Sequence, residues 1–290
     1  MSATPKPTSH AYGAGYRDEQ LEKYRNRATN HWRHRIALAH RLVDRYALPR
    51  LADRAPGEIV VVDVGCSIGT FAIEFAKRGF SAYGVDFDPV ALAAAEELAA
   101  AEAVSPVFVQ RDVAEWQLEF PAIDIAVAFD LFEHLHDDEL GAMLQALRVS
   151  LSPQGCLVYH TYPTEFDYVL GRRGLPVAPL AGLPPRAFQR VVRAYASVIR
   201  GAQWLATGAD HRERIKRIAH CNPTTPERLR DILERAGYQS AYMATAQLYE
   251  KSRRKYRRFR GQPVADMNLF GVAWPARGDR PVVDRLAADH

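Results

Sequence analysis

A glycine-containing turn carries the clearest chemical pattern in the sequence. The segment Val61-Val62-Asp63-Val64-Gly65-Cys66-Ser67-Ile68-Gly69 joins a β-branched run to a helix-forming stretch. Glycines let a ligand approach the backbone where a Cβ atom would collide, and the helix N-terminus offers free N–H groups. Dinucleotide enzymes space their glycines as GxGxxG and bind pyrophosphate at this place. Here the spacing is Gly65-x-Ser67-x-Gly69 with Asp63 before it, which disfavours pyrophosphate and favours a cationic ligand.

Two further acidic residues follow at the ends of predicted strands. Asp86 directly follows the predicted strand 81–85, and Asp112 comes shortly after the predicted strand 107–110. Each has an apolar neighbour, Phe87 and Val113 respectively. Ligands of open α/β sheets bind at the carboxyl ends of the strands, so these residues are expected at one edge together with the glycine turn.

This ordered set resembles the class I S-adenosylmethionine-dependent methyltransferases over roughly residues 59–163 and the closing strands. Their first motif is typically D-x-G-C-G-x-G, and Ser67 stands here in place of the middle glycine. The segment from Phe129 to Leu135, FDLFEHL, resembles the "EHL" segment of the small-molecule branch. The resemblance implies S-adenosylmethionine as the cofactor, with Asp86 at the ribose hydroxyls and Asp112 at the adenine amino group. The cofactor-binding set that it implies is Asp63, Gly65, Cys66, Ser67, Gly69, Asp86, Phe87, Asp112, Val113 and Phe129.

Methyl transfer from a sulfonium is an in-line displacement, so the protein mainly has to align the acceptor with the donor. A hydroxyl acceptor also needs a base whose pKa lies near the operating pH, and histidine suits that task. His134 follows the fourth predicted strand and His160 ends the fifth. Both are candidate catalytic residues, with a purely structural role as the alternative for each. His31 and Trp32 of the N-terminal helix are candidates for a lid over the cofactor.

Alternating strand and helix patterns position these residues. Strands are predicted at 59–64, 81–85, 107–110, 123–129 and 156–160, with helices between them, and two last strands at 240–248 and 268–274. This rhythm predicts an α/β fold with a doubly wound, mostly parallel seven-stranded sheet of the Rossmann-like methyltransferase type. One helix is predicted over residues 18–46, and another opens at Thr225-Pro226 and ends at Gly237.

The strand rhythm breaks after residue 163, which suggests four parts. We expect an N-terminal helical lid at 1–55, a cofactor-binding core at 56–163, a helical substrate cap at 164–220 between strand five and the last helix, and completion of the sheet by 221–290. The cap carries ten Lys or Arg residues against four Asp or Glu. Tyr162, Arg172 and Arg190 are therefore candidates for binding a partly apolar and anionic acceptor. The alternative is an amphipathic helix whose arginines face solvent.

Composition excludes several classes of protein. The 290 residues are 48% hydrophobic and 25% charged, as in globular domains. No apolar run approaches the roughly 20 residues of a membrane-spanning helix, and the start of the chain lacks a signal-peptide pattern. Three cysteines give no disulfide framework, so a cytoplasmic protein is expected. No metal site is expected, since His134-Leu135-His136-Asp137-Asp138 is the nearest approach to one.

The favoured function is methylation of a small-molecule or glycan/lipid-precursor acceptor at a hydroxyl, with nitrogen or carbon as alternatives. Residues 251–260 hold seven basic side chains, which keeps an RNA methyltransferase or contact with an anionic membrane surface open as alternatives, although nucleic acid is not favoured. A nicotinamide dehydrogenase and a non-catalytic cofactor-binding subunit are two further readings. The sequence leaves the acceptor and the oligomeric state undecided.

Overall fold

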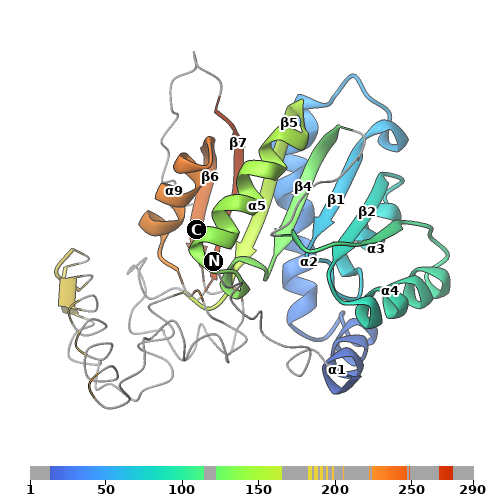
Figure 1. Cartoon of the computed structure of the whole chain (residues 1–290), viewed down its shortest axis with the longest axis horizontal. Helices are drawn as coiled ribbons and strands as arrows, with labels where there is room; N and C mark the ends of the chain where they lie inside the picture. Colours follow the sequence, from blue (N-terminus) through green and yellow to red (C-terminus); the bar gives the residue numbers. More distant parts are fainter. Residues whose placement is uncertain are drawn as a thin grey trace, which may run out of the picture.

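The computed structural model of the chain describes residues 14–113, 122–164, 222, 224–246, 248 and 268–276, with scattered residues between 182 and 205. Figure 1 shows a single central sheet with helices on both of its faces. This three-layer arrangement agrees with the predicted α/β class. It buries both faces of the sheet, as a mostly parallel sheet requires.

The described residues form a seven-stranded sheet in the order β3-β2-β1-β4-β5-β7-β6. The first five strands pair in parallel, while β7 is antiparallel to both of its neighbours. The prediction of a doubly wound, mostly parallel sheet is confirmed. The strand order reverses between β1 and β4, which is the place where such sheets bind ligands. The strands are β1 (Val60–Val64), β2 (Ser81–Asp86), β3 (Val107–Gln110), β4 (Ile123–Phe129), β5 (Leu151–Thr161), β6 (Tyr238–Ala246) and β7 (Asn268–Pro275).

The helices begin where side chains cap their free N–H groups. Asp88 accepts a hydrogen bond from Val90 N at 2.9 Å, and Thr225 accepts one from Arg228 N at 3.2 Å. Asn30 accepts one from Trp32 N at 2.8 Å and begins a second helix there, so the single helix predicted over 18–46 was wrong. The main helices are α1 (Ala14–Arg25), α2 (His31–Leu42), α3 (Thr70–Ala76), α4 (Pro89–Ala101), α5 (Asp137–Ser150) and α9 (Pro226–Arg235).

Successive residues of each strand serve the two layers of core alternately. Val60 and Val62 of β1 belong to a cluster with the inner faces of α5 and α9, while Val61 belongs to a cluster with α2 and α3. Figure 1 shows α5 in front of the sheet and α2 behind it. The C-terminal half of α2, with Leu38 and Leu42, is thus part of the core.

The strand β5 begins five residues earlier than predicted. Leu151 pairs with Ile123 and Cys156 pairs with Ile125, so residues 152–155 form an irregularity within the β4–β5 pairing. The cause is Asp124, which is fully buried and accepts hydrogen bonds from the Ser152 hydroxyl at 2.7 Å and from Val60 N at 2.9 Å. Arg54 forms an ion pair with the same carboxylate. Ser152 is therefore fixed to the sheet by a buried partner that no local pattern reveals.

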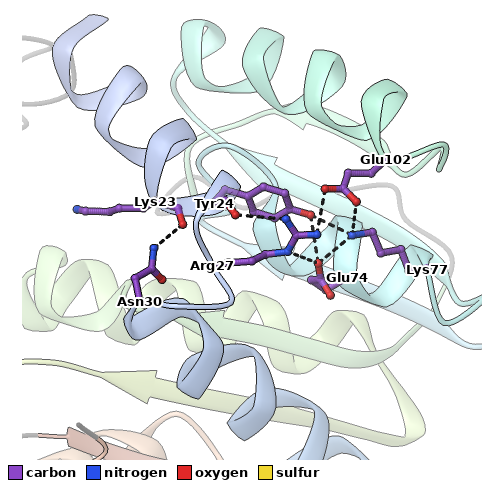
Figure 2. A network of polar contacts seen from close by, with 7 residues as sticks. All are labelled: Lys23, Tyr24, Arg27, Asn30, Glu74, Lys77 and Glu102. Carbon is purple, nitrogen blue, oxygen red and sulfur yellow. Dashed lines mark hydrogen bonds and ion pairs between the residues drawn. The ribbon is translucent and has the colours of Figure 1, made fainter. Parts of the chain in front are cut away.

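A polar network fixes α1 over α3 and α4 (Figure 2). The Tyr24 hydroxyl donates to Glu74 at 3.1 Å, and Lys77 binds both Glu74 at 3.0 Å and Glu102 at 2.6 Å. Arg27 forms an ion pair with Glu102 at 3.0 Å and lies 4.1 Å above the Tyr24 ring. Tyr24 is fully buried against Ile68 of the glycine turn. The network thus places α1 directly behind that turn.

We predict that Asp124→Ala lowers the free energy of unfolding by roughly 2–4 kcal/mol, because Val60 N and the Ser152 hydroxyl lose a buried acceptor. Urea unfolding followed by circular dichroism measures the change. Glu97→Ala on the exposed face of α4 is the control and should shift the free energy by less than about 0.5 kcal/mol. A variant Asp124→Ala as stable as this control would contradict the assignment.

Candidate active site

The turn between β1 and α3 is built from residues in left-handed backbone conformation. The φ angles are +71° at Gly65, +48° at Ser67 and +74° at Gly69. A Cβ atom at Gly69 would lie 2.6 Å from the Phe108 ring, and one at Gly65 would lie 2.7 Å from a Leu131 methyl group. Both glycines are therefore required by backbone angle and by space. The turn is held to β2, because Gly65 N and Cys66 N both donate to a backbone carbonyl of that strand.

Ser67 occupies the left-handed conformation that a glycine would adopt more easily. Its backbone N–H donates to Asp86 Oδ2 at 2.8 Å, which compensates for the cost of the conformation. Its hydroxyl oxygen is buried and has no hydrogen-bond partner among the described residues. A buried hydroxyl without a partner beside a glycine turn fits a ligand that supplies the missing partner.

Asp86 lies at the end of β2, next to the turn. Its carboxylate accepts backbone hydrogen bonds from Ser67 N at 2.8 Å and Asp88 N at 3.0 Å, and the backbone of Phe87 also stabilises its charged form. A carboxylate has about four lone-pair sites, so a vicinal diol could still donate to it. Burial raises the pKa of this carboxyl group, since 8% of the residue is exposed. Phe87 directly after it is 46% exposed and offers an apolar surface beside the acid.

Asp63 is oriented toward α3. Its carboxylate accepts a hydrogen bond from Ala72 N at 3.2 Å, and burial raises its pKa to about 7. The contact of Asp63 with a cationic ligand stays a prediction, because the hydrogen bond that Asp63 makes in the structure is with Ala72 N of α3. Cys66 is also buried, and burial raises the pKa of its thiol well above the usual range, so it remains a neutral thiol under the turn.

The remaining predicted cofactor residues lie at the same edge. Gln110 pairs with Asp86, and the amide of Arg111 donates to the Asp86 carbonyl at 2.8 Å, which brings Asp112 close to Asp86 along the edge. Asp112 is half-buried and Val113 is buried. At the end of β4, the buried Phe129 ring lies 4.7 Å from the Phe71 ring of α3. The fold thus brings together the ends of β1, β2, β3 and β4.

The two candidate histidines differ in exposure. His160 is fully buried, with Nδ1 2.8 Å from Asp130 Oδ1 and Nε2 3.0 Å from Asn268 Oδ1. His134 is half-buried in the short 3-10 helix Phe132–His134 that follows β4. Sequence reasoning missed Asp130 and Asn268 as partners of His160, since their pairing depends on the register of β5 with β4 and β7.

Glu133, quoted in sequence only as part of the "EHL" segment, is almost completely buried. It accepts a hydrogen bond from the Thr161 hydroxyl at 2.8 Å. Burial raises its pKa well above the usual range, and the nearby Asp130 carboxylate adds to this. The Glu133 carboxyl group therefore favours its neutral form more than an exposed glutamate would.

The ends of the insertion meet beside this segment. Thr164 and Thr224 form an isolated parallel bridge. Asn222 donates from its backbone to the Glu133 carbonyl at 2.8 Å and from its side chain to the Leu135 carbonyl at 2.8 Å. The residues between 164 and 222 therefore leave and rejoin the core at the carboxyl edge of β4 and β5.

The predicted acceptor-binding residues are only partly described. Tyr162 is half-buried just after β5, and Arg190 is exposed. Arg172 and the basic run 251–260 lie outside the described residues. Within the described ranges, no group of three His, Cys, Asp or Glu side chains could hold a metal ion. No helix in that part of the chain is long and apolar enough to cross a membrane.

Comparison with known proteins identifies the family. The model of a family described as a methyltransferase domain matches residues 31–241, so the chain belongs to that family. Ribosomal protein L11 methyltransferase of Thermus thermophilus is 37% identical over 117 residues, which cover 40% of this chain and 43% of that protein. The chain aligns with less than half the length of the curated relatives that it matches.

Solved structures agree on the fold. A TehB-like S-adenosylmethionine-dependent methyltransferase from Corynebacterium glutamicum matches with a TM-score of 0.52 and 16% identity, over 91% of this chain and 100% of that one. Magnesium protoporphyrin IX methyltransferase from Synechocystis with bound S-adenosylhomocysteine matches with a TM-score of 0.51 and 17% identity, over 92% and 99%. Family, fold and site together define a class I S-adenosylmethionine-dependent methyltransferase, and S-adenosylmethionine is its cofactor.

We predict that Asp86→Ala weakens binding of S-adenosylhomocysteine about tenfold or more, because a ribose would lose a charged acceptor. Isothermal titration calorimetry measures the dissociation constant. Asp88→Ala is the matched control, since its side chain caps α4, and its affinity should stay within about threefold of the parent protein. Equal binding by Asp86→Ala and the parent protein would refute the assignment.

We also predict that Asp63 makes stability depend on pH. The folded protein keeps the Asp63 proton up to about pH 7, whereas the unfolded chain loses it near pH 4. The folded state binds more protons in this window, so the stability due to Asp63 declines as the pH rises from about 4 to 7. Asp63→Asn remains neutral, so its free energy of unfolding should fall less over this range in urea titrations. Parallel curves for the variant and the parent protein would contradict the assignment.

Proposed function

We propose that the protein transfers a methyl group from S-adenosylmethionine to a hydroxyl group of a small molecule, with glycan or lipid precursors as the preferred class. The observation that carries this proposal is the position of the insertion. Its two ends meet at the Thr164–Thr224 bridge and are fixed to the "EHL" segment through Asn222. An insertion rooted there is well placed to cover an acceptor at the ends of β4 and β5.

The residues of the chain divide the work. S-adenosylmethionine supplies a methyl group that its sulfonium charge already activates. Asp86 and the turn Gly65–Gly69 would hold and orient S-adenosylmethionine. The acceptor hydroxyl needs a base to take its proton. We assign that role to His134, because its side chain is half-buried and follows Glu133, whose carbonyl accepts a hydrogen bond from Asn222 N, whereas His160 is fully buried. Glu133 is almost completely buried and accepts a hydrogen bond from the Thr161 hydroxyl, so we do not assign it the role of base.

The charge of the insertion favours an anionic acceptor. It holds ten Lys or Arg residues against four Asp or Glu, and Arg190 is exposed. A phosphorylated or nucleotide-linked sugar or a polyprenyl phosphate would satisfy both this charge and the aromatic residues of the same segment. Tyr162 and Arg172 are part of the same proposed surface. Methylation at nitrogen or carbon, and methylation of RNA through residues 251–260, are the alternatives.

The test is a panel of acceptors with release of S-adenosylhomocysteine as the readout. Sugar phosphates, nucleotide sugars, polyprenyl phosphates, phenols, amines and total RNA are each incubated with the protein and S-adenosylmethionine. The proposal expects turnover with a hydroxyl acceptor and an O-methyl product by mass spectrometry. Turnover confined to RNA or to amines would overturn it.

With such an acceptor, His134→Gln should lower kcat/KM by about 100-fold or more, because the proton loses its acceptor. Binding of S-adenosylhomocysteine should remain within about twofold. His136→Gln is the matched control, since His136 lies at the N-terminus of α5 and outside the proposed base position. A His134→Gln enzyme with the rate of this control would remove His134 from the mechanism.

A further inference from the structure

Four side chains from four segments form a buried polar chain at the carboxyl edge of the sheet. Arg35 of α2 lies 2.9 Å from Asp130 Oδ2, just after β4. The other oxygen of Asp130 lies 2.8 Å from His160 Nδ1 in β5, and His160 Nε2 lies 3.0 Å from Asn268 Oδ1 in β7. The side chains of Arg35 and Asp130 are 11% and 18% exposed, and His160 and Asn268 are fully buried.

The contacts of this chain determine where the His160 protons lie. The Asn268 amide nitrogen donates to the Ala246 carbonyl at 3.1 Å, which leaves its oxygen toward His160. His160 Nε2 must therefore carry a hydrogen. On the other side Nδ1 faces a carboxylate: burial raises the pKa of Asp130, but Arg35 and then His160 outweigh it and lower that pKa to about 2. Both ring nitrogens of His160 therefore lie within about 3 Å of side-chain oxygens of the protein itself.

Both ring nitrogens of His160 thus face side chains of the protein itself, so neither is available to take a proton from an acceptor. The charged groups next to His160 are Arg35 and Asp130, which are positive and negative respectively. Burial raises the pKa of the nearby Glu133 well above its usual range. His31 is neutral, since burial and then Arg35 lower its pKa to about 4. His134 also lies within electrostatic range of Asp130.

Aromatic contacts close this chain into a ring. Arg35 lies 5.5 Å over the Trp32 ring, which meets Phe71 of α3 edge-on at 5.8 Å. Phe71 lies 4.7 Å from Phe129, and Phe129 stacks on His160 at 5.4 Å. The first turn of α2 is therefore joined to β4 and β5 by ion pairs on one side and by aromatic rings on the other.

Asp130 also sets the path of the segment that follows it. Its φ is +56°, a left-handed conformation that costs a non-glycine residue about 1–2 kcal/mol and needs tertiary contacts to persist. Leu131 directly after it fills the space that Gly65 leaves open, and His134 follows one turn later. A change in the Asp130 backbone would shift both.

We propose that His160, held between Asp130 and Asn268, is a positioning residue that fixes Asp130 and closes the first turn of α2 against the carboxyl edge as a rigid wall of the site. This replaces the role of base predicted from sequence for His160. It also makes His31 and Trp32 part of a fixed wall rather than of an opening lid. The proposal rests on the proposed function only where turnover is measured.

The first test needs no acceptor. In full-length protein labelled with ¹⁵N-histidine, the ring-nitrogen resonances of His160 should shift in Asp130→Asn, because Nδ1 loses the carboxylate 2.8 Å away. His160→Gln assigns these resonances, and Asp44→Asn, which lies away from His160, should leave them unchanged. Unchanged His160 resonances in Asp130→Asn would overturn the proposal, whatever the acceptor.

The second test concerns position. Hydrogen exchange in the first turn of α2 should accelerate about tenfold or more in Asp130→Asn, because the ion pair with Arg35 weakens. Arg35→Gln should also accelerate exchange in the first turn of α2, because it removes the positive partner of Asp130. Arg35→Lys keeps the positive charge and should accelerate exchange less than Arg35→Gln. Asp44→Asn is the matched control: it removes an exposed ion pair with Arg78 just after α2 and should leave exchange in the first turn unchanged. Unchanged exchange in Asp130→Asn would contradict the proposal that Asp130 holds the first turn of α2 against the sheet.

Once an acceptor is known, Asp130→Asn should lower kcat about tenfold with little change in KM for S-adenosylmethionine, since the proposed base moves while the cofactor residues stay. A loss confined to KM would contradict the positioning role. Failure to find a hydroxyl acceptor would refute the proposed function and leave the NMR and exchange results standing.

Discussion

Three left-handed residues, Gly65, Ser67 and Gly69, turn the chain from β1 into α3, and the rest of the site depends on that turn. Its left-handed backbone conformation is held by hydrogen bonds to the neighbouring strand β2. β2 supplies a carbonyl to the turn at one end and the Asp86 carboxylate to Ser67 N at the other. A ligand held at this turn therefore touches Asp86 as a consequence of the same hydrogen bonds.

Buried acids surround this turn, and each is stabilised differently. Asp86 accepts hydrogen bonds from backbone N–H groups, Asp130 is held as an anion by Arg35 and His160, and burial raises the pKa of Glu133. Asp63 caps α3 and titrates near neutral pH. Burying four carboxyl groups side by side would be very unfavourable if all were charged and unpaired. The division into paired anions and neutral acids makes the arrangement stable.

Local patterns in the sequence were sufficient for much of the core. The bounds of β3 and β4 were predicted to the residue, since each is a short apolar run between clear breaks. The start of β5 was missed, because Ser152 is recruited by the distant Asp124. The single helix predicted over 18–46 was wrong, because the apolar spacing continues through Asn30 while its side chain accepts a hydrogen bond from Trp32 N and begins a new helix.

The residues of the candidate site that belong to one local motif could be predicted from sequence. The contacts that depend on how distant strands and helices pack together could not. The glycine turn and Asp86 could be read from spacing alone. The partners of His160 could not, since Arg35, Asp130 and Asn268 lie far apart in sequence and meet only when α2, β4, β5 and β7 pack together. The acceptor surface stays hardest to predict, because an insertion has no spacing rule that relates it to the sheet.

The central claim is that the turn Gly65–Gly69 binds a cationic, phosphate-free adenosine ligand. Calorimetric titration of the full-length protein with S-adenosylmethionine and, separately, with NAD⁺ tests it most directly. We predict one S-adenosylmethionine per chain, bound about a hundredfold or more tighter than NAD⁺, because the spacing Gly65-x-Ser67-x-Gly69 differs from the GxGxxG turn that binds a pyrophosphate. Equal or tighter binding of NAD⁺ would contradict it.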